Sequence, residues 1–363
     1  MVRFHQHYHP EGAFTDWQDD HPAGHAIVAT IAELHLDATV LPILCDILNP
    51  TSPGTSCNLA SVASWADSIR DKLPWSAPMH YVNADDNDDH PPQVCKFPGP
   101  KGFQGGKNVN VLGAVRNNTD ILAQWVQDGS DLDDPTASDA LKFLIHFVGD
   151  MHQPFHTVAR LQGANGISVK WGTEKTSEHN SPWLFVEHDL ISEVEFHAMW
   201  DGDVVKRAIS TTPSKWTKPL AAEIEKHLHG NQYDPLIRKV LVDGINKTWV
   251  GEVNSWIKCP TIDSLSHGGP DEQIVLRSQW RASDTDDGSV CPWYWAAPIH
   301  NLTCEWIWPK EVDEGKPLVQ LDVDWYGGKV TKEWVVERFL TMGGLRLAAI
   351  LNLIFAHAPG SDV

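Results

Sequence analysis

Basic residues are scarce in this chain: 28 Lys and Arg stand against 48 Asp and Glu, which gives a formal net charge of −20. A broad basic surface for duplex DNA is therefore excluded, because such surfaces neutralise phosphates with Lys and Arg. Low-complexity composition is also missing. With 42% hydrophobic residues and 17 Trp among its 363 residues, the chain can bury a sizeable core and should fold as a globular protein.

Long apolar runs are missing too. Residues 345–358 form the longest one near the C-terminus, but Arg346, Asn352 and His357 interrupt it, and it is shorter than the ~20 residues of a membrane span. We therefore predict a buried helix there and no membrane span. The first twelve residues lack the apolar segment of a signal peptide, so they do not themselves predict secretion.

Two common metal and redox motifs are missing as well. The six cysteines form no CxxC pair, so neither a zinc ribbon nor a thioredoxin-type site is indicated. No HExxH is present, and a zincin-type peptidase is therefore not expected. The even number of cysteines permits three disulfides and weakly favours an oxidising compartment. Glycosylation sequons occur at Asn117, Asn246 and Asn301, which is little above chance.

The pattern of apolar residues indicates an all-α fold class. Apolar positions recur mostly at helical spacing, as in Ile27, Ile31 and Leu34, and continuous β alternation is rare. Long loops separate the predicted helices, and residues 161–195 have room for a small β-hairpin. None of the loops is typical of an interdomain linker. We therefore predict an N-terminal extension over residues 1–20 and a single domain over residues 21–358.

The most informative stretch is HFVGDMHQPFH, residues 146–156. It ends a helix that is apolar on every face, and His146 and Asp150, four residues apart, project from the same side of that helix. A buried carboxylate needs a cation or several hydrogen-bond donors. Pro154 ends the helix and lets His156 turn back toward the same place. This segment alone leaves two interpretations open, a metal site and an ordinary hydrogen bond between a core histidine and aspartate.

A second His and Asp pair of the same spacing favours the metal site. FHAMWD carries His197 and Asp201, again four apart and again among aromatic residues. Imidazole and carboxylate donors together suit zinc. Upstream, His25 lies near a helix start and His80 lies in MHYVNADDN, although a lone histidine is more often a cap or a satisfied core residue.

The segment SWADSIR supplies one further carboxylate, Asp67, three residues before Arg70. A pair with this spacing is usually an ordinary surface ion pair that contributes little to stability. Asp67 is therefore a metal-ligand candidate only in combination with the other motifs.

Taken in order, GHAIVATIA, SWADSIR, MHYVNADDN, HFVGDMHQPFH and FHAMWD resemble the zinc-dependent, single-strand-specific nuclease and 3′-nucleotidase family of fungi and plants, the S1 and P1 type. The family is related to zinc phospholipase C. The resemblance implies a single, mainly helical domain with three zinc ions in a cleft. The expected activity is hydrolysis of single-stranded RNA and DNA to 5′-nucleotides.

 The same resemblance implies a monomeric, secreted enzyme that also acts on 3′-nucleotides.

The resemblance assigns the ligands to three zinc ions. One zinc would be held by Asp67, His80, His146 and Asp150, and a second by His156, His197 and Asp201. Asp150 would bridge to a third zinc that it shares with His25. In the family, the third site is completed by an N-terminal Trp five residues before the first His. Here Asp20 stands at that position and Trp17 lies eight residues before His25, so Asp20, His21 or Trp17 would have to supply the missing ligands. The resemblance also implies a disulfide between Cys95 and Cys291.

The implied chemistry is an attack of zinc-bound hydroxide on phosphorus, because zinc lowers the pKa of bound water to ~7. Asp67 would accept the proton of this water, and Arg70 would donate to the phosphate oxygens. The alternative for Arg70 is an ion pair with Asp67.

Three further residues are predicted to contact the substrate. Tyr81 would stack on a base. Asn83 stands where fungal members have an Asp that contacts the base, so their base preference is not transferred. Asn165, in GANGI, resembles a GGN segment of the family and would contact the nucleotide or form a turn. His152 is out of phase with the ligands and is expected behind them.

Two other functions are compatible with these residues. A zinc phospholipase C would use nearly the same ligands but would need an apolar rim that faces lipid. A noncatalytic, metal-stabilised secreted homologue would bind fewer than three zinc ions per chain.

Overall fold

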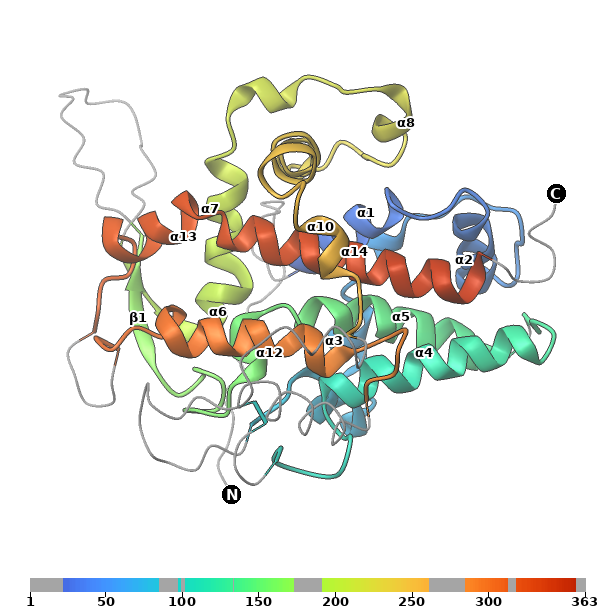
Figure 1. Cartoon of the computed structure of the whole chain (residues 1–363), viewed down its shortest axis with the longest axis horizontal. Helices are drawn as coiled ribbons and strands as arrows, with labels where there is room; N and C mark the ends of the chain where they lie inside the picture. Colours follow the sequence, from blue (N-terminus) through green and yellow to red (C-terminus); the bar gives the residue numbers. More distant parts are fainter. Residues whose placement is uncertain are drawn as a thin grey trace, which may run out of the picture.

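The computed structural model describes residues 22–84, 97–98, 102–132, 134–172, 191–260, 285–312 and 318–356. In this part of the chain the fold is mainly helical with one two-stranded sheet, which confirms the predicted class. The longer helices, among them α4, α5, α12 and α14, run roughly along the longest axis of the molecule (Figure 1).

Among the described residues the regular elements are short apart from five helices of eleven to twenty-one residues. The α-helices are α1 Pro22–Glu33, α2 Val40–Leu48, α3 Trp65–Ile69, α4 Val111–Gln127, α5 Pro135–Asp150, α6 Phe196–Ala198, α7 Val204–Ser210, α8 Ala222–Glu225, α9 Asp234–Lys239, α10 Val253–Trp256, α12 Pro292–Leu302, α13 Lys329–Lys332 and α14 Val335–Phe355. The 3-10 and π segments are η1 Leu59–Val62, η2 Pro74–His80, η3 Pro154–Thr157, η4 Met199–Asp203, η5 Ser214–Thr217, η6 Val240–Thr248, η8 Thr303–Ile307 and η9 Asp324–Gly328.

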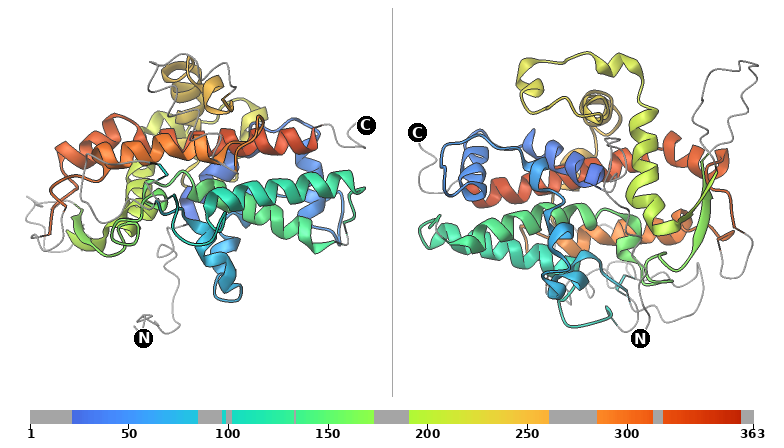
Figure 2. Two further views of the ribbon diagram at one scale, coloured as in Figure 1. Left: turned by 60° about the horizontal axis from the view of Figure 1, so that its bottom comes forward. Right: turned by 180° about the vertical axis from the view of Figure 1, so that it is seen from behind.

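Helices α1, α5 and α14 form the centre of the fold. α5 packs against α4 on one side and contacts α1 and α14 on the other, and Figure 2 shows the α4 and α5 pair beside α14 from two further directions. Asp134 caps α5 by accepting a hydrogen bond from the backbone N–H of Thr136 at 2.9 Å, and Pro135 occupies the first turn. Asp150, at the C-terminal end of α5, is buried, so this end of the helix lies in the interior of the protein.

Helix α14 confirms the buried helix that the C-terminal apolar run predicts. The continuous helical stretch 324–355 is long and apolar enough to cross a membrane by composition alone, but 67% of its most apolar window is buried inside the protein. Burial on this scale is typical of the core helix of a soluble protein, and the hydrophobic effect explains its apolar character without a membrane.

The small hairpin expected within residues 161–195 is also present. Strand β1, Ser168–Trp171, pairs antiparallel with β2, Ser192–Glu195. The N–H of Lys170 donates to the carbonyl of Val319 at 2.8 Å, and the N–H of Leu321 donates to the carbonyl of Lys170 at 2.9 Å. These bonds attach the hairpin to the segment that leads into η9.

The predicted disulfide between Cys95 and Cys291 is wrong. Cys291 bonds to Cys259 with a Cα–Cα distance of 5.7 Å, and one thiol can form only one disulfide. Cys95 lies outside the described residues. The reason is tertiary: the segment after α10 brings Cys259 beside Cys291 at the start of α12.

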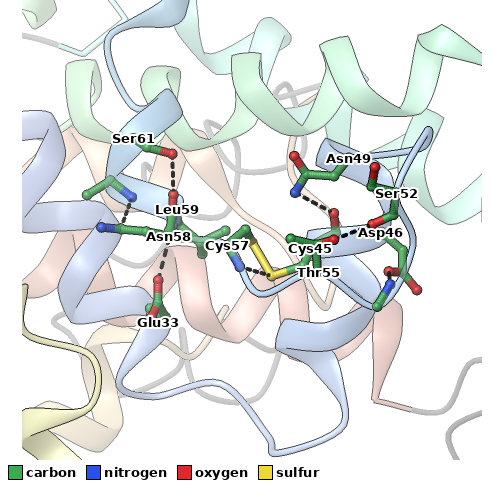
Figure 3. The surroundings of a disulfide bond; sticks show 12 residues. Glu33, Cys45, Asp46, Asn49, Ser52, Thr55, Cys57, Asn58, Leu59 and Ser61 are labelled. Carbon is green, nitrogen blue, oxygen red and sulfur yellow. Dashed lines mark hydrogen bonds between the residues drawn. A yellow bond between two sulfur atoms is a disulfide. The ribbon is translucent and has the colours of Figure 1, made fainter.

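A second disulfide joins Cys45 on α2 to Cys57 (Figure 3). The N–H of Cys57 lies 3.1 Å from the sulfur of Cys45, and the next residue, Asn58, caps η1. Glu33, at the end of α1, accepts a hydrogen bond from the N–H of Leu59 at 3.1 Å (Figure 3). Together these contacts fix the loop between α2 and η1 against α1.

Candidate metal centre

Seven of the eight predicted metal ligands line one cleft of about 680 Å³, and the eighth, His146, is buried behind them. The ligands come from α1, α3, α5 and α6, from the short segments η2, η3 and η4, and from positions up to 176 residues apart, His25 to Asp201. Their donor atoms form three groups, each compact enough to hold one ion: His25, His146 and Asp150; Asp67, His80 and His146; and His156, His197 and Asp201.

The group of Asp67, His80 and His146 lies around the carboxylate of Asp150 at the end of α5. Oδ2 of Asp150 lies 3.0 Å from Nδ1 of His80 and 3.2 Å from Nε2 of His146. The Asp67 carboxylate lies 3.5 Å from the same nitrogen of His80 and 3.6 Å from that of His146. Two carboxylates and two imidazoles thus face a common point.

The group of His156, His197 and Asp201 lies on the short segments η3, α6 and η4. Nε2 of His197 is 3.2 Å from Nε2 of His156 and 3.3 Å from Oδ2 of Asp201. Asp201 belongs to a π-helical turn, a rare conformation that occurs frequently at functional sites. Gln153, which the sequence analysis did not single out, donates from Nε2 to Oδ1 of Asp201 at 2.7 Å. Its position three residues before His156 was the only available signal.

The remaining group consists of His25, His146 and the other carboxylate oxygen of Asp150. Nε2 of His25 lies 3.4 Å from Oδ1 of Asp150, and its ring stacks on the His146 ring at 3.9 Å between centroids. Gly149 makes this approach possible, because a Cβ at this position would lie 2.4 Å from Nδ1 of His25. Asp150 therefore faces two groups at once, as the resemblance implies for a bridging ligand.

The histidine tautomers support a cation at these points. Nδ1–H of His146 donates to the carbonyl of Ala63 at 2.7 Å, and Nδ1–H of His156 donates to that of His80 at 2.6 Å. Nδ1–H of His197 donates in the same way to Gly163 at 2.5 Å. With the proton held on Nδ1, the lone pair of each Nε2 points into the cluster. Converging lone pairs repel one another unless a cation lies between them, and such outer hydrogen bonds are typical of metal-binding histidines.

A buried ligand atom without a hydrogen-bond partner also supports a bound cation. Among the ligand atoms that face the cluster, Oδ2 of Asp150 is buried and makes no hydrogen bond. An orphaned carboxylate oxygen in the interior is costly. The donor set of nitrogen and oxygen atoms fits zinc, so the residues present are suited to the ions that the resemblance implies.

The charges of the site favour cation binding at neutral pH. Burial alone would raise the pKa of Asp150, but His146 and His156 hold it well below its usual value. Burial, together with the neighbouring His146, lowers the pKa of His25 to about 4. For His156, burial is outweighed by Asp150 and Asp201, which raise its pKa to about 9, so without metal its Nε2 carries a proton that a bound zinc ion would displace. The aspartates are therefore ionised and their field stabilises positive charge between them.

The remaining predicted residues lie in different places. Arg70 and Tyr81 line the cleft, and Nη1 of Arg70 is 3.8 Å from Oδ1 of Asp67. Asn165 lines it as well and donates from Nδ2 to the carbonyl of Gln162 at 2.8 Å, as a turn asparagine does. Asn83 is not among the lining residues; its carbonyl accepts a hydrogen bond from the N–H of Gln104 at 2.8 Å.

His152 lines the same cleft but belongs to none of the three ligand groups. Its Nδ1–H donates to the carbonyl of Val148 at 2.7 Å, and its Nε2 accepts from Arg346 on α14 at 2.7 Å. Burial and the neighbouring arginine lower the pKa of His152 to about 3, so the ring is neutral. The residues proposed to complete the third zinc site, Asp20, His21 and Trp17, lie outside the described residues.

Comparison with known proteins decides the family. A sequence profile of the S1/P1 nuclease family matches residues 21–268, which is more than half of the chain and includes all eight ligands. This chain belongs to the S1/P1 nuclease family. The predicted family is therefore confirmed. A member of the S1/P1 nuclease family is a hydrolase that acts on the phosphodiester bonds of nucleic acids, and this is the general activity of the protein.

Individual relatives in the S1/P1 nuclease family match along most of their length. Endonuclease 2 of Arabidopsis thaliana is 26% identical over 336 residues, which cover 92% of this chain and 89% of the relative. Nuclease PA3 of Penicillium sp is 32% identical over 316 residues, or 86% and 96% of the two chains. Nuclease P1 of Penicillium citrinum is 30% identical over 253 residues, or 68% and 82%.

Proposed function

We propose that the protein is a zinc-dependent endonuclease that hydrolyses single-stranded RNA and DNA to 5′-nucleotides and also removes phosphate from 3′-nucleotides. The observation that carries the proposal is the arrangement of three ligand groups around Asp150, with imidazole lone pairs directed inward by backbone carbonyls. One zinc would be held by Asp67, His80, His146 and Asp150, a second by His156, His197 and Asp201, and a third by His25 with Asp150.

Two side chains of the cleft, Asp67 and Arg70, would have separate roles in the reaction. Bound zinc supplies an acidified water and stabilises negative charge on oxygen. Asp67, which is 44% exposed, can accept the proton of the attacking water. Arg70, whose side chain is 53% exposed, can leave its long contact with Asp67 and donate to the phosphate oxygens. Both residues reach solvent, so substrate can approach them directly.

Substrate recognition would depend on single-stranded character. Tyr81 lines the cleft with 41% of its surface exposed, and an aromatic ring there can stack on an unpaired base. Asn165 is proposed as a second contact to the nucleotide. Bases that are already stacked in a duplex cannot reach such a ring, and three zinc ions would make the cleft locally positive in a protein of net charge −20.

We also propose that residues 21–358 form one nuclease domain after an N-terminal extension over residues 1–20, and that the protein is a secreted monomer. The two described disulfides fit an oxidising compartment. Sedimentation of the purified protein tests the monomer, and sequencing the N-terminus of the natural protein tests secretion and the ligands of the third zinc.

One set of measurements tests the proposed function. Purified protein should contain about three zinc ions per chain by mass spectrometry and should degrade single-stranded RNA and DNA faster than duplex DNA. Hydrolysis of phosphatidylcholine without nuclease activity would instead support the phospholipase alternative. One zinc or none, without activity on either substrate, would support the noncatalytic alternative.

A further inference from the structure

Exposed aromatic side chains flank a single short helix beside the metal cleft. Among the described residues, three aromatic side chains are strongly exposed: Trp75 at 54%, Trp325 at 48% and Tyr81 at 41%. Trp75 is in the first turn of η2, and Tyr81 directly follows the last residue of that segment. Large aromatic surface left in water beside a binding cleft is typical of an interaction site.

Trp75 is held at its surface position by aromatic neighbours. Its ring is tilted against Phe143 at 5.7 Å between centroids, and Phe143 also meets Trp65 edge to face at 5.1 Å. The ammonium group of Lys142 lies 4.7 Å from the centre of the Trp65 ring. We call Trp65, Trp75, Lys142 and Phe143 the Trp75 ledge. It presents one exposed ring, supported from behind, with a cation beside it.

Two estimates along the chain give the length that separates the ledge from the cleft, one ending at Tyr81 and the other at Asp150. Six residues of η2 separate Trp75 from Tyr81, which corresponds to about 12 Å at ~2 Å per residue of 3-10 helix. Along α5, seven residues separate Phe143 from Asp150, which corresponds to about 10.5 Å at ~1.5 Å per residue. At ~3.4 Å per stacked nucleotide, this is the length of about three nucleotides.

The charges near the ledge suit a phosphate backbone. Arg70 lies in the cleft lining, and Lys142 lies on the ledge. Lys142 also contacts Asp139 at 3.4 Å, a surface ion pair of low energy that a phosphate can replace. A strand that runs from the cleft to the ledge would therefore meet a cation at each end, in a protein that is acidic as a whole.

We propose that the Trp75 ledge is a second base-stacking subsite for single-stranded nucleic acid. It would hold a base about three nucleotides away from the base that stacks on Tyr81. The proposal rests on the proposed nuclease function. Every base has an aromatic face, so the ledge adds affinity for longer single strands without selecting their sequence.

The test compares oligothymidylates of two and eight nucleotides as substrates. Trp75→Ala should raise KM for the eight-nucleotide strand about tenfold with kcat unchanged, which is the size expected for one lost stacking contact. KM for the dinucleotide, which is too short to span both rings, should change less than twofold. Trp75→Phe should restore most of the affinity. Trp325→Ala removes a similarly exposed tryptophan that lies outside the ledge and packs beside Tyr326, and it should change neither value.

A second variant tests the cation of the ledge. Lys142→Gln should lower the salt dependence of binding to the eight-nucleotide strand by about 0.7 in the slope of log K against log salt. Equal slopes in both proteins would remove Lys142 from the subsite.

Two outcomes would overturn the subsite. An equal loss on both substrates after Trp75→Ala would mean that the ring only supports the fold, and no loss on either would mean that the strand passes elsewhere. Should the natural protein cleave no oligonucleotide, the proposed function fails, but fluorescence anisotropy of the labelled eight-nucleotide strand still tests the ledge. Equal affinity of the natural protein and Trp75→Ala in that measurement would overturn it.

Discussion

The two sides of the metal centre are built differently. On one side, Asp150, His146 and His80 are almost fully buried, and the first two are fixed by the long helix α5. On the other side, His156, His197 and Asp201 are half-buried and lie on segments of three to five residues. A buried carboxylate without a cation is costly, and a half-buried one is partly satisfied by water. The buried side should therefore depend more strongly on its metal than the half-buried side does.

The largest expected effect follows from Asp150. Asp150→Asn should abolish nuclease activity and remove about two zinc ions per chain, because the carboxylate faces two ligand groups. Asp201→Asn, the matched change on the half-buried side, should remove about one. Zinc content by mass spectrometry and activity on single-stranded RNA check both variants. An Asp150→Asn protein that keeps most of its activity would refute the bridging role.

Arg70 gives the next effect in size. Arg70→Ala should lower turnover about a hundredfold, a loss of ~2.7 kcal/mol of transition-state stabilisation, while zinc content stays unchanged. Steady-state kinetics and metal analysis of the same preparation check this. Loss of zinc together with activity would show that Arg70 supports Asp67 structurally, which is the ion-pair alternative.

A variant of Gln153 tests the half-buried side, because Gln153 supports the ligand Asp201 without being a ligand itself. Gln153→Leu removes the hydrogen bond to Asp201 and should weaken zinc binding at that group by about 10- to 100-fold. Competition with a zinc-binding dye measures the affinity. Gln153→Glu is a less useful variant because it adds a negative charge beside the carboxylate; unchanged affinity in Gln153→Leu would show that Asp201 needs no such support.

The smallest expected effect concerns stability: removal of all metal should lower the stability of the fold without unfolding it. A chelator should lower the melting temperature by about 10 °C, since each of three ions at a hundredfold excess over its Kd stabilises the protein by ~2.7 kcal/mol. On metal removal, the fold-increase in amide hydrogen exchange should be larger at the C-terminal end of α5, on the buried side, than in η4, on the half-buried side. A larger fold-increase in η4 than in α5 would reverse the comparison between the two sides.

Local sequence patterns were sufficient for much of the fold and for the choice of candidate ligands. The spacing of His146 and Asp150 predicts one helix face, Pro154 predicts the end of that helix, and the apolar run near residue 350 predicts the buried α14. That these residues bind zinc, and that Arg70 and Asn165 contact substrate, remain predictions.

The sequence by itself determined the helical class, the family and the residues able to bind metal, because helix period and motif order are local properties of the chain. Only the tertiary structure decided that Cys291 bonds to Cys259, that Gly149 admits the His25 ring, and that Trp75 is exposed beside the cleft. It also decided that the carbonyls of Ala63, His80 and Gly163 direct three imidazoles inward. The physical reason is that these contacts join residues far apart in sequence, and their distances depend on how helices pack rather than on the period of any one helix.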